Sequence, residues 1–220
     1  MHLAVLACAF LSGIVSHAEV PAGATMLDGI AVLTAGLPSD ESAAIPILKS
    51  DLELEARLLL VRRHGPLWKS QPLDEPVRVA ARRSAAFIKL LARQVRQMGE
   101  AVNPTDRDAL VNRLTLLAGG EDQMAGLLRQ SGADRDDLEA WAVDATLAII
   151  KLIYLEERIE PPSDLETSAR FAAGGHPFTG RELADVRSDF RRWLMNKQVE
   201  RMLEEELVNA LKHRWIRIVH

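Results

Sequence analysis

Residues 77–98 read VRVAARRSAAFIKLLARQVRQM, and this stretch decides the fold class. Its apolar residues recur every three or four positions, while arginine and lysine occupy the other face. The apolar stripe consists of Ala81, Ala85, Ile88, Leu91, Ala92, Val95 and Met98. A period of about 3.6 residues is typical of an amphipathic helix that packs against a core. The stretch therefore predicts a long helix with one buried face.

Similar periodicity predicts further helices on both sides of this one. They are expected over residues 51–64, 107–118, 121–130, 134–159 and 181–212. Ser50, followed by Glu53, has the pattern of a capping box at the start of the first of them. Short β-branched runs predict strands at residues 28–34 and 215–219, with residues 45–48 extending that edge. The predicted fold is mainly helical, with a small two-stranded terminal β ribbon and a long C-terminal helix.

The N-terminal residues are typical of a secretory signal peptide. Residues 3–15 form an apolar run without a charge, and Ser16-His17-Ala18 then supplies small residues where signal peptidase cleaves. We expect cleavage after Ala18, with Ala24 as the second choice, and a periplasmic location. The run is preceded by no lysine or arginine, so a truncated gene start and a buried N-terminal helix are the alternative interpretations.

The remaining chain is divided by its proline and glycine positions. After a lead-in over residues 19–27, a helical domain is expected over 28–162 and a linker over 163–180. The helix and strand of residues 181–220 are expected to pack back on the same domain.

Composition excludes several classes of function. The chain of 220 residues has 27 basic and 31 acidic side chains and a formal net charge of −4. Nucleic-acid binding would instead favour a clustered basic surface. The single cysteine, Cys8, lies within the predicted signal peptide, so a mature chain would have no thiol for disulfides, catalysis or metal binding.

No motif for catalysis or for cofactor binding stands out. The six histidines include no H-x-x-x-H or H-E-x-x-H pair that would place two metal ligands on one helix face. Gly119-Gly120 and Gly174-Gly175 lack the neighbouring residues of a phosphate loop and are interpreted as helix stops. Glutamate clusters at residues 156–157 and 204–206 lie beside arginines and are interpreted as solvated, ion-paired faces. We therefore predict no catalytic residue, no cofactor and no metal, and a protein that is not an enzyme.

The order of elements resembles the N-terminal domain of SurA-type periplasmic chaperones. The resemblance is carried by a strand followed by ILKSDLELEAR at residues 47–57, by Asn103-Pro104-Thr105-Asp106, and by Leu127–Gly132 followed by Asp136-Asp137-Leu138. In that family a parvulin prolyl-isomerase module is inserted where residues 161–180 stand here, and those residues are too few to contain one. The sequence departs from the family at Thr34-Ala35-Gly36, where an asparagine is usual, and in the loop of residues 68–75.

The resemblance implies an ATP-independent holding chaperone for unfolded or nascent exported polypeptides, in particular outer-membrane proteins. The mild acidic balance predicts no nucleic acid, and the short apolar run predicts no stable membrane insertion. A homodimer stays open. The alternative is an assembly or adaptor protein that docks one dedicated partner. Apolar residues in loops and at a helix end are the client-binding candidates, with core packing as the alternative for each. They are Leu67, Trp68, Met98, Phe171 and Phe178.

Overall fold

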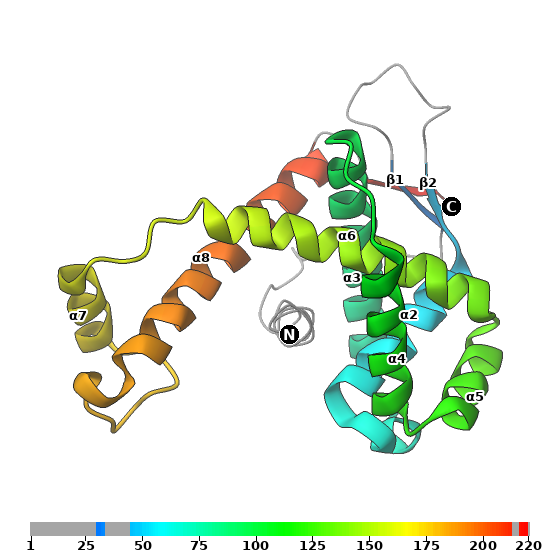
Figure 1. Cartoon of the computed structure of the whole chain (residues 1–220), viewed down its shortest axis with the longest axis horizontal. Coiled ribbons are helices and arrows are strands. Elements are labelled where there is room, and N and C mark those ends of the chain that lie inside the picture. The colour runs from blue at the N-terminus through cyan, green and yellow to red at the C-terminus, as the bar shows by residue number, and fades with distance from the viewer. Residues whose placement is uncertain (1–29, 34–44, 213–215, 220) are drawn as a thin grey trace. The chain divides into compact units, whose positions relative to one another are not determined.

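The computed structural model describes residues 30–33, 45–212 and 216–219 (Figure 1). The predicted signal peptide, both possible cleavage sites and the lead-in lie outside the described residues. The chain divides into two compact units, of which unit 1 contains residues up to Lys151 together with Ala210 onward, and unit 2 contains Leu152–Asn209. The boundaries between the units fall inside two helices. The sequence instead predicted one domain over 28–162, completed by residues 181–220 after a linker.

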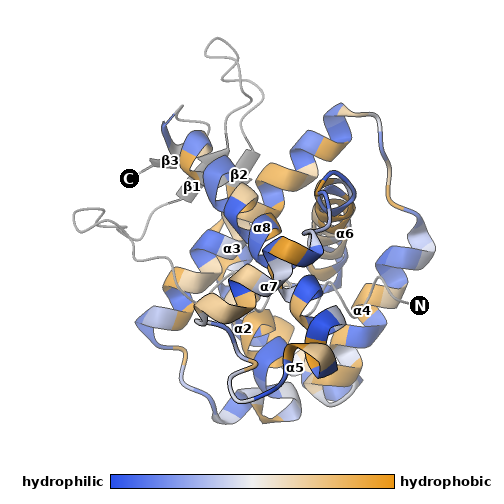
Figure 2. Cartoon of the chain, turned by 90° about the vertical axis from the view of Figure 1, so that its left-hand side faces the viewer, coloured by the Kyte–Doolittle hydropathy of each residue, from blue (hydrophilic) through white to orange (hydrophobic). Residues whose placement is uncertain are grey.

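The mainly helical class is confirmed. The elements in chain order are β1 (Ile30–Leu33), β2 (Ile45–Ile47), α2 (Lys49–His64), the 3₁₀ helix η2 (Gly65–Ser70), α3 (Glu75–Gln97), α4 (Pro104–Ala118), α5 (Glu121–Ser131), α6 (Arg135–Glu157), α7 (Asp164–Ala173), α8 (Leu183–Lys212) and β3 (Ile216–Val219). Hydrophilic and hydrophobic residues alternate along these helices (Figure 2), the pattern of helices with one buried face.

The helix α3 organises the core of unit 1. It begins after Asp74, whose carboxylate accepts a hydrogen bond from the backbone N–H of Val77 at 3.1 Å. Near its start, Ala80 and Ala81 pack with residues of α2, and near its end Ala92 and Val95 pack with Leu147 of α6. The predicted apolar stripe is buried from Ala81 to Val95, so the periodicity of the sequence placed this face correctly.

The helix α2 begins earlier than its sequence predicted. Leu48, not Ser50, holds the N-cap position, and the backbone N–H of Leu48 donates to the Asp51 carboxylate at 2.9 Å. The acidic residue three positions into the helix thus satisfies the cap, and Ser50 lies within the first turn.

Gly119 and Gly120 separate α4 from α5, as predicted. Both have φ of 103°, a region that side chains with a Cβ rarely adopt. The backbone N–H of Gly120 donates to the carbonyl of Thr115 at 2.9 Å, which satisfies one of the last carbonyls of α4. This pair is a helix stop.

The three strands pair in the order β2-β1-β3. Both pairings are antiparallel, and Ala31 stands opposite Ile47 on one side and Ile218 on the other. The elements are three or four residues long, so they do not by themselves define a fold family.

Unit 2 contains a helix where the sequence predicted a linker. Residues 164–173 form α7, and the Ser163 hydroxyl accepts a hydrogen bond from the backbone N–H of Glu166 at 3.1 Å. Gly174 and Gly175 end this helix, as the sequence predicted. The predicted linker over 163–180 thus contains a helix that its sequence did not indicate.

Candidate functional site

A pocket lies in unit 2 between α7 and α8. Its volume is about 300 Å³, at the lower end of the range of small-molecule and peptide side-chain pockets. The α7 side supplies Pro162, Glu166, Arg170, Ala173 and Gly174, and the α8 side supplies Trp193, Leu194, Lys197, Gln198 and Arg201. On each helix these positions recur every three or four residues, so one face of α7 and one face of α8 form the two walls. We call this pocket the α7–α8 groove.

Polar contacts hold α7 against α8. The Asp164 carboxylate pairs with Arg187 at 2.9 Å and with Arg191 at 3.2 Å. Arg191 also donates to the carbonyl of Pro162 at 3.1 Å. Since one guanidinium reaches two groups at the start of α7, it fixes the end of the groove that Pro162 lines.

An aromatic cluster adjoins the groove. Phe190 lies at its centre with no exposed surface, and its ring stacks on Trp193 with centroids 5.6 Å apart. Phe171 and Phe178 meet Phe190 edge to face at 5.0 and 5.9 Å. Such ring pairs add to the stability gained from burial alone. Trp193 belongs to both the cluster and the groove, so the cluster fixes one groove wall.

His176 ties the loop after α7 into this cluster. Its ring stacks on Phe171 at 4.4 Å. The backbone N–H of Phe178 donates to Nδ1 of His176 at 3.2 Å, so Nδ1 is the acceptor and the opposite nitrogen, Nε2, donates to the carbonyl of Phe171 at 3.0 Å. His176 therefore has a packing role in unit 2.

Cations outnumber acids in the groove. Arg170, Lys197 and Arg201 face a single carboxylate among the lining residues, that of Glu166. Lys197 pairs with Glu200 at 2.5 Å. Within the part of the chain that the structure describes, Arg170 and Arg201 have no ion-pair or hydrogen-bond partner, and the buried Oε1 of Gln198 has none either. The groove therefore combines an apolar wall with guanidinium groups that are available to a ligand.

Unit 1 contains a buried carboxylate, that of Glu55 in α2. Glu55 has no exposed surface, and it accepts hydrogen bonds from Arg62 at 2.6 Å, from Ser84 at 2.6 Å and from the Trp141 indole N–H at 2.7 Å. A carboxylate with three donors, one of them charged, is stabilised as a structural ion pair. We assign it to the packing of α2, α3 and α6 and not to chemistry.

Asp144 of α6 is also a buried carboxylate held by ion pairs. It is buried and pairs with Lys89 at 2.8 Å and Arg96 at 2.5 Å, both on α3. The two ion pairs add a polar contact beside the apolar α3–α6 core.

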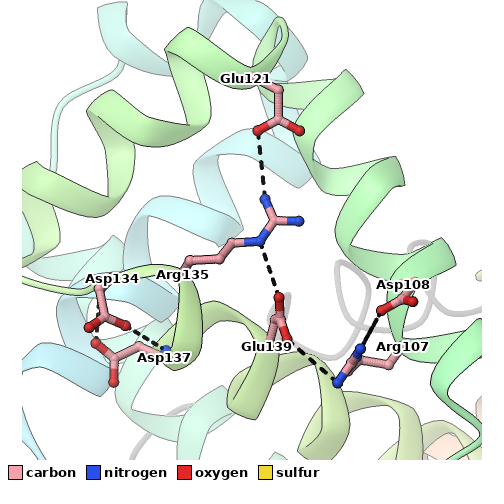
Figure 3. Close-up of polar contacts among 7 residues, drawn as sticks. All are labelled: Arg107, Asp108, Glu121, Asp134, Arg135, Asp137 and Glu139. Atoms are coloured by element: carbon pink, nitrogen blue, oxygen red, sulfur yellow. Dashed lines mark hydrogen bonds and ion pairs between the residues drawn. The ribbon is translucent and has the colours of Figure 1, made fainter.

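Ion pairs also connect α4, α5 and α6 on the surface of unit 1 (Figure 3). Arg135 pairs with Glu121 and Glu139, and Arg107 pairs with Glu139 and Asp108. The hydrogen bond to the Asp108 carboxylate raises the pKa of Arg107 above its usual value. Every charge in this network has a partner of opposite sign, so the network links helices and offers no unpaired group to a ligand.

The five client-binding candidates lie in different environments. Leu67 and Met98 are exposed at 66% and 59%, in η2 and at the end of α3. Trp68 is 1% exposed, and its indole N–H donates to the carbonyl of Ala118 at 3.3 Å, so it is a core residue, the alternative that the sequence left open. Phe171 and Phe178 are half-buried in the aromatic cluster beside the groove.

The groove residues themselves were not among the candidates. Arg170 lay in the predicted linker, and Trp193 and Leu194 lay in the helix predicted over 181–212. Their common wall becomes visible only once α7 is recognised as a helix, and Ser163 with Glu166 three residues later is the signal that could have identified it.

Comparisons with known proteins gave no match: neither a family model, nor a curated protein, nor a solved structure matches this chain. In the described ranges, no helix is both long enough and apolar enough to cross a membrane. Nor do three or more histidine, cysteine, aspartate or glutamate side chains come together as a metal site among those residues.

Proposed function

We propose that the chain is an ATP-independent holding chaperone of the periplasm that binds unfolded exported polypeptides, in particular outer-membrane proteins. The observation that carries the proposal is the α7–α8 groove, whose apolar wall adjoins an aromatic cluster. A holding chaperone needs apolar surface that accepts varied segments, bordered by charges that keep the empty protein in solution. The groove offers both.

The SurA-type fold, with its terminal ribbon of residues 28–34 and 215–219, belongs to this proposal. It rests on the order of elements in the sequence and on the residues that resemble the family. The absence of enzymatic activity is also proposed, since the parvulin module is the catalytic part of the resemblance.

Export is the third part of the proposal. It is supported by the apolar run of residues 3–15 and by the small residues before position 19. N-terminal sequencing of the protein recovered from a periplasmic fraction should begin at Glu19, or at Thr25 if cleavage follows Ala24. A chain that retains Met1 would contradict export with cleavage.

The holding function is tested by light scattering. A chemically unfolded β-barrel protein is diluted into buffer with and without the chain from Glu19, in the absence of nucleotide. We expect near-stoichiometric amounts to suppress aggregation. Unchanged aggregation would contradict the holding function and would favour the alternative, an adaptor that docks one dedicated partner in a stoichiometric complex.

A pair of leucine variants tests the groove as the contact site. Leu194 lines the groove, whereas Leu165 of α7 is exposed and lies outside it. Leu194→Ser should weaken the suppression of aggregation, because it removes apolar surface from the groove, and Leu165→Ser should leave it unchanged. If Leu165→Ser had the larger effect, the contact would lie elsewhere on unit 2.

A further inference from the structure

We infer that the α7–α8 groove selects polypeptide segments in which a carboxylate lies beside an aromatic or aliphatic side chain. This inference deepens the proposed function, on which it rests, by naming the chemical class of segment that is held. The first observation is the charge of the groove. Arg170 lies on one wall and Arg201 on the other, and neither has a partner among the residues that the structure describes.

Guanidinium groups in this state favour one kind of ligand. An arginine presents several N–H donors in a plane and binds a carboxylate through two parallel hydrogen bonds, which are stronger than hydrogen bonds between neutral groups. Glu166 is the one acid in the lining, and Lys197 is already paired with Glu200. The two arginines and Glu166 leave one net positive charge for a ligand, and a single carboxylate would balance it.

The second observation is the apolar part of the groove lining. Trp193, Leu194 and Pro162 line the same groove, and the stacking of Trp193 on Phe190 holds the indole in place. When a ligand side chain packs on an indole that is already held in place, the protein loses little additional conformational freedom. The carboxylate and the apolar group are thus recognised by neighbouring parts of one groove.

Peptides are favoured over other anionic ligands by the size and mixed lining of the groove. A volume of about 300 Å³ accommodates one or two side chains. Nucleic acid would favour a continuous basic surface, whereas the whole chain has a formal net charge of −4. The occupant that fits is a short stretch of polypeptide.

The test measures fluorescence anisotropy of three peptides that carry an uncharged fluorophore. The first contains Phe-Leu-Glu-Phe between Gly-Ser ends and is amidated at its C-terminus. The second has glutamine in place of glutamate, and the third has this glutamine together with a free C-terminal carboxylate after phenylalanine. The second peptide measures apolar binding alone, while the first and third compare a side-chain carboxylate with a terminal one.

Two double variants of the protein each remove two arginine charges, at different places in unit 2. Arg170→Gln/Arg201→Gln removes the groove arginines, and Arg181→Gln/Arg192→Gln removes two exposed arginines of unit 2 that do not line the groove. All four side chains are exposed, so both variants should fold, and circular dichroism checks this.

We expect a carboxylate peptide to bind the wild-type chain about three- to tenfold more tightly than the glutamine peptide, the size of charge-assisted contacts in a partly exposed site. This preference should be lost in Arg170→Gln/Arg201→Gln, kept in Arg181→Gln/Arg192→Gln, and weakened by added salt. Equal binding of the three peptides, equal losses in the two variants, or preferential binding to vesicles of anionic phospholipid would each overturn the inference.

The failure of this inference differs from the failure of the proposed function. Suppressed aggregation with no preference for a carboxylate would overturn the inference alone. Aggregation that is not suppressed, together with a retained preference for the carboxylate peptide, would overturn the holding function and support the groove as a carboxylate-selective site.

Discussion

At the scale of residues, Leu67 and Trp68 show how neighbours in one short segment can have opposite roles. Both are apolar and lie in the proline-rich stretch after α2, and the sequence selected both as surface contacts. The turn of η2 directs the Leu67 side chain into solvent and buries Trp68, whose N–H reaches the carbonyl of Ala118 at the end of α4. A carbonyl in the last turn of a helix lacks a partner within the helix, and the indole supplies one.

This pair yields a prediction for stability. Trp68→Ala should lower the free energy of unfolding by about 3–5 kcal/mol, because it leaves a cavity in the core. Leu67→Ala should change it by less than about 0.5 kcal/mol, as expected for an exposed side chain. Urea denaturation followed by circular dichroism measures both. Similar values for the two variants would contradict the burial of Trp68.

Leu67 and Trp68 also show how much of the candidate site could be predicted from the sequence. Its pattern identified apolar residues outside the long helical stripes, but periodicity does not show which side of an irregular segment faces a core. Trp68 is directed inward by its contact with Ala118 of α4, which is distant in sequence. Phe171 and Phe178 were selected for the same reason, and the structure places both beside the groove.

At the scale of elements, α7 is the feature that the sequence did not reveal. Its apolar residues do not mark its packed face, since Leu165, Ala169 and Ala172 are exposed while the polar Thr167 is buried. The long helices α3, α6 and α8 were predicted because their apolar stripes extend over many turns. The short helix α5 was predicted as well, because its Met124, Leu127 and Leu128 form a buried apolar face. The packed face of α7 has no such stripe, so its capping residues carry most of the available information.

The cap of α7 gives a second prediction. Ser163→Ala removes the acceptor for the backbone N–H of Glu166 and should destabilise the start of the helix by about 1 kcal/mol. Hydrogen exchange of the amides of residues 164–173 should accelerate accordingly. Ser168→Ala, at an exposed position inside the same helix, is the matched control and should slow exchange or leave it unchanged, because alanine favours a helix interior. Equal acceleration in both variants would show that the cap is not responsible.

At the scale of the whole molecule, the chain forms two compact units, and α6 and α8 each continue across the boundary between them. The sequence predicted one domain that the last helix completes. Glycine and proline mark ends of helices, and here they led to a boundary at 163–180, whereas the units divide at positions inside helices where no such residue stands. A division of this kind depends on which helix faces pack together, and local sequence signals do not record it.

Two core substitutions test the division. Phe190→Ala removes the centre of the aromatic cluster, with an expected cost of about 3–5 kcal/mol. Amide exchange should accelerate in α7 and in residues 183–209 and stay nearly unchanged in α2 to α5. Leu114→Ala, a fully buried position of unit 1, should give the opposite pattern. If either variant accelerated exchange equally in both sets of helices, the chain would open as a single cooperative unit.

The buried carboxylate of Glu55 has a consequence for how α2, α3 and α6 find their alignment. Leucine and alanine faces attract one another without a preferred direction, so two such helices can slide by one turn, about 5.4 Å, and still bury similar areas. Glu55 makes the misaligned arrangements costly, because a shift would separate its carboxylate from Ser84 and Trp141 and leave Arg62, on the same helix, as the one remaining partner of the three. One acidic residue thereby discriminates between competing registers that the apolar side chains around it would accept almost equally.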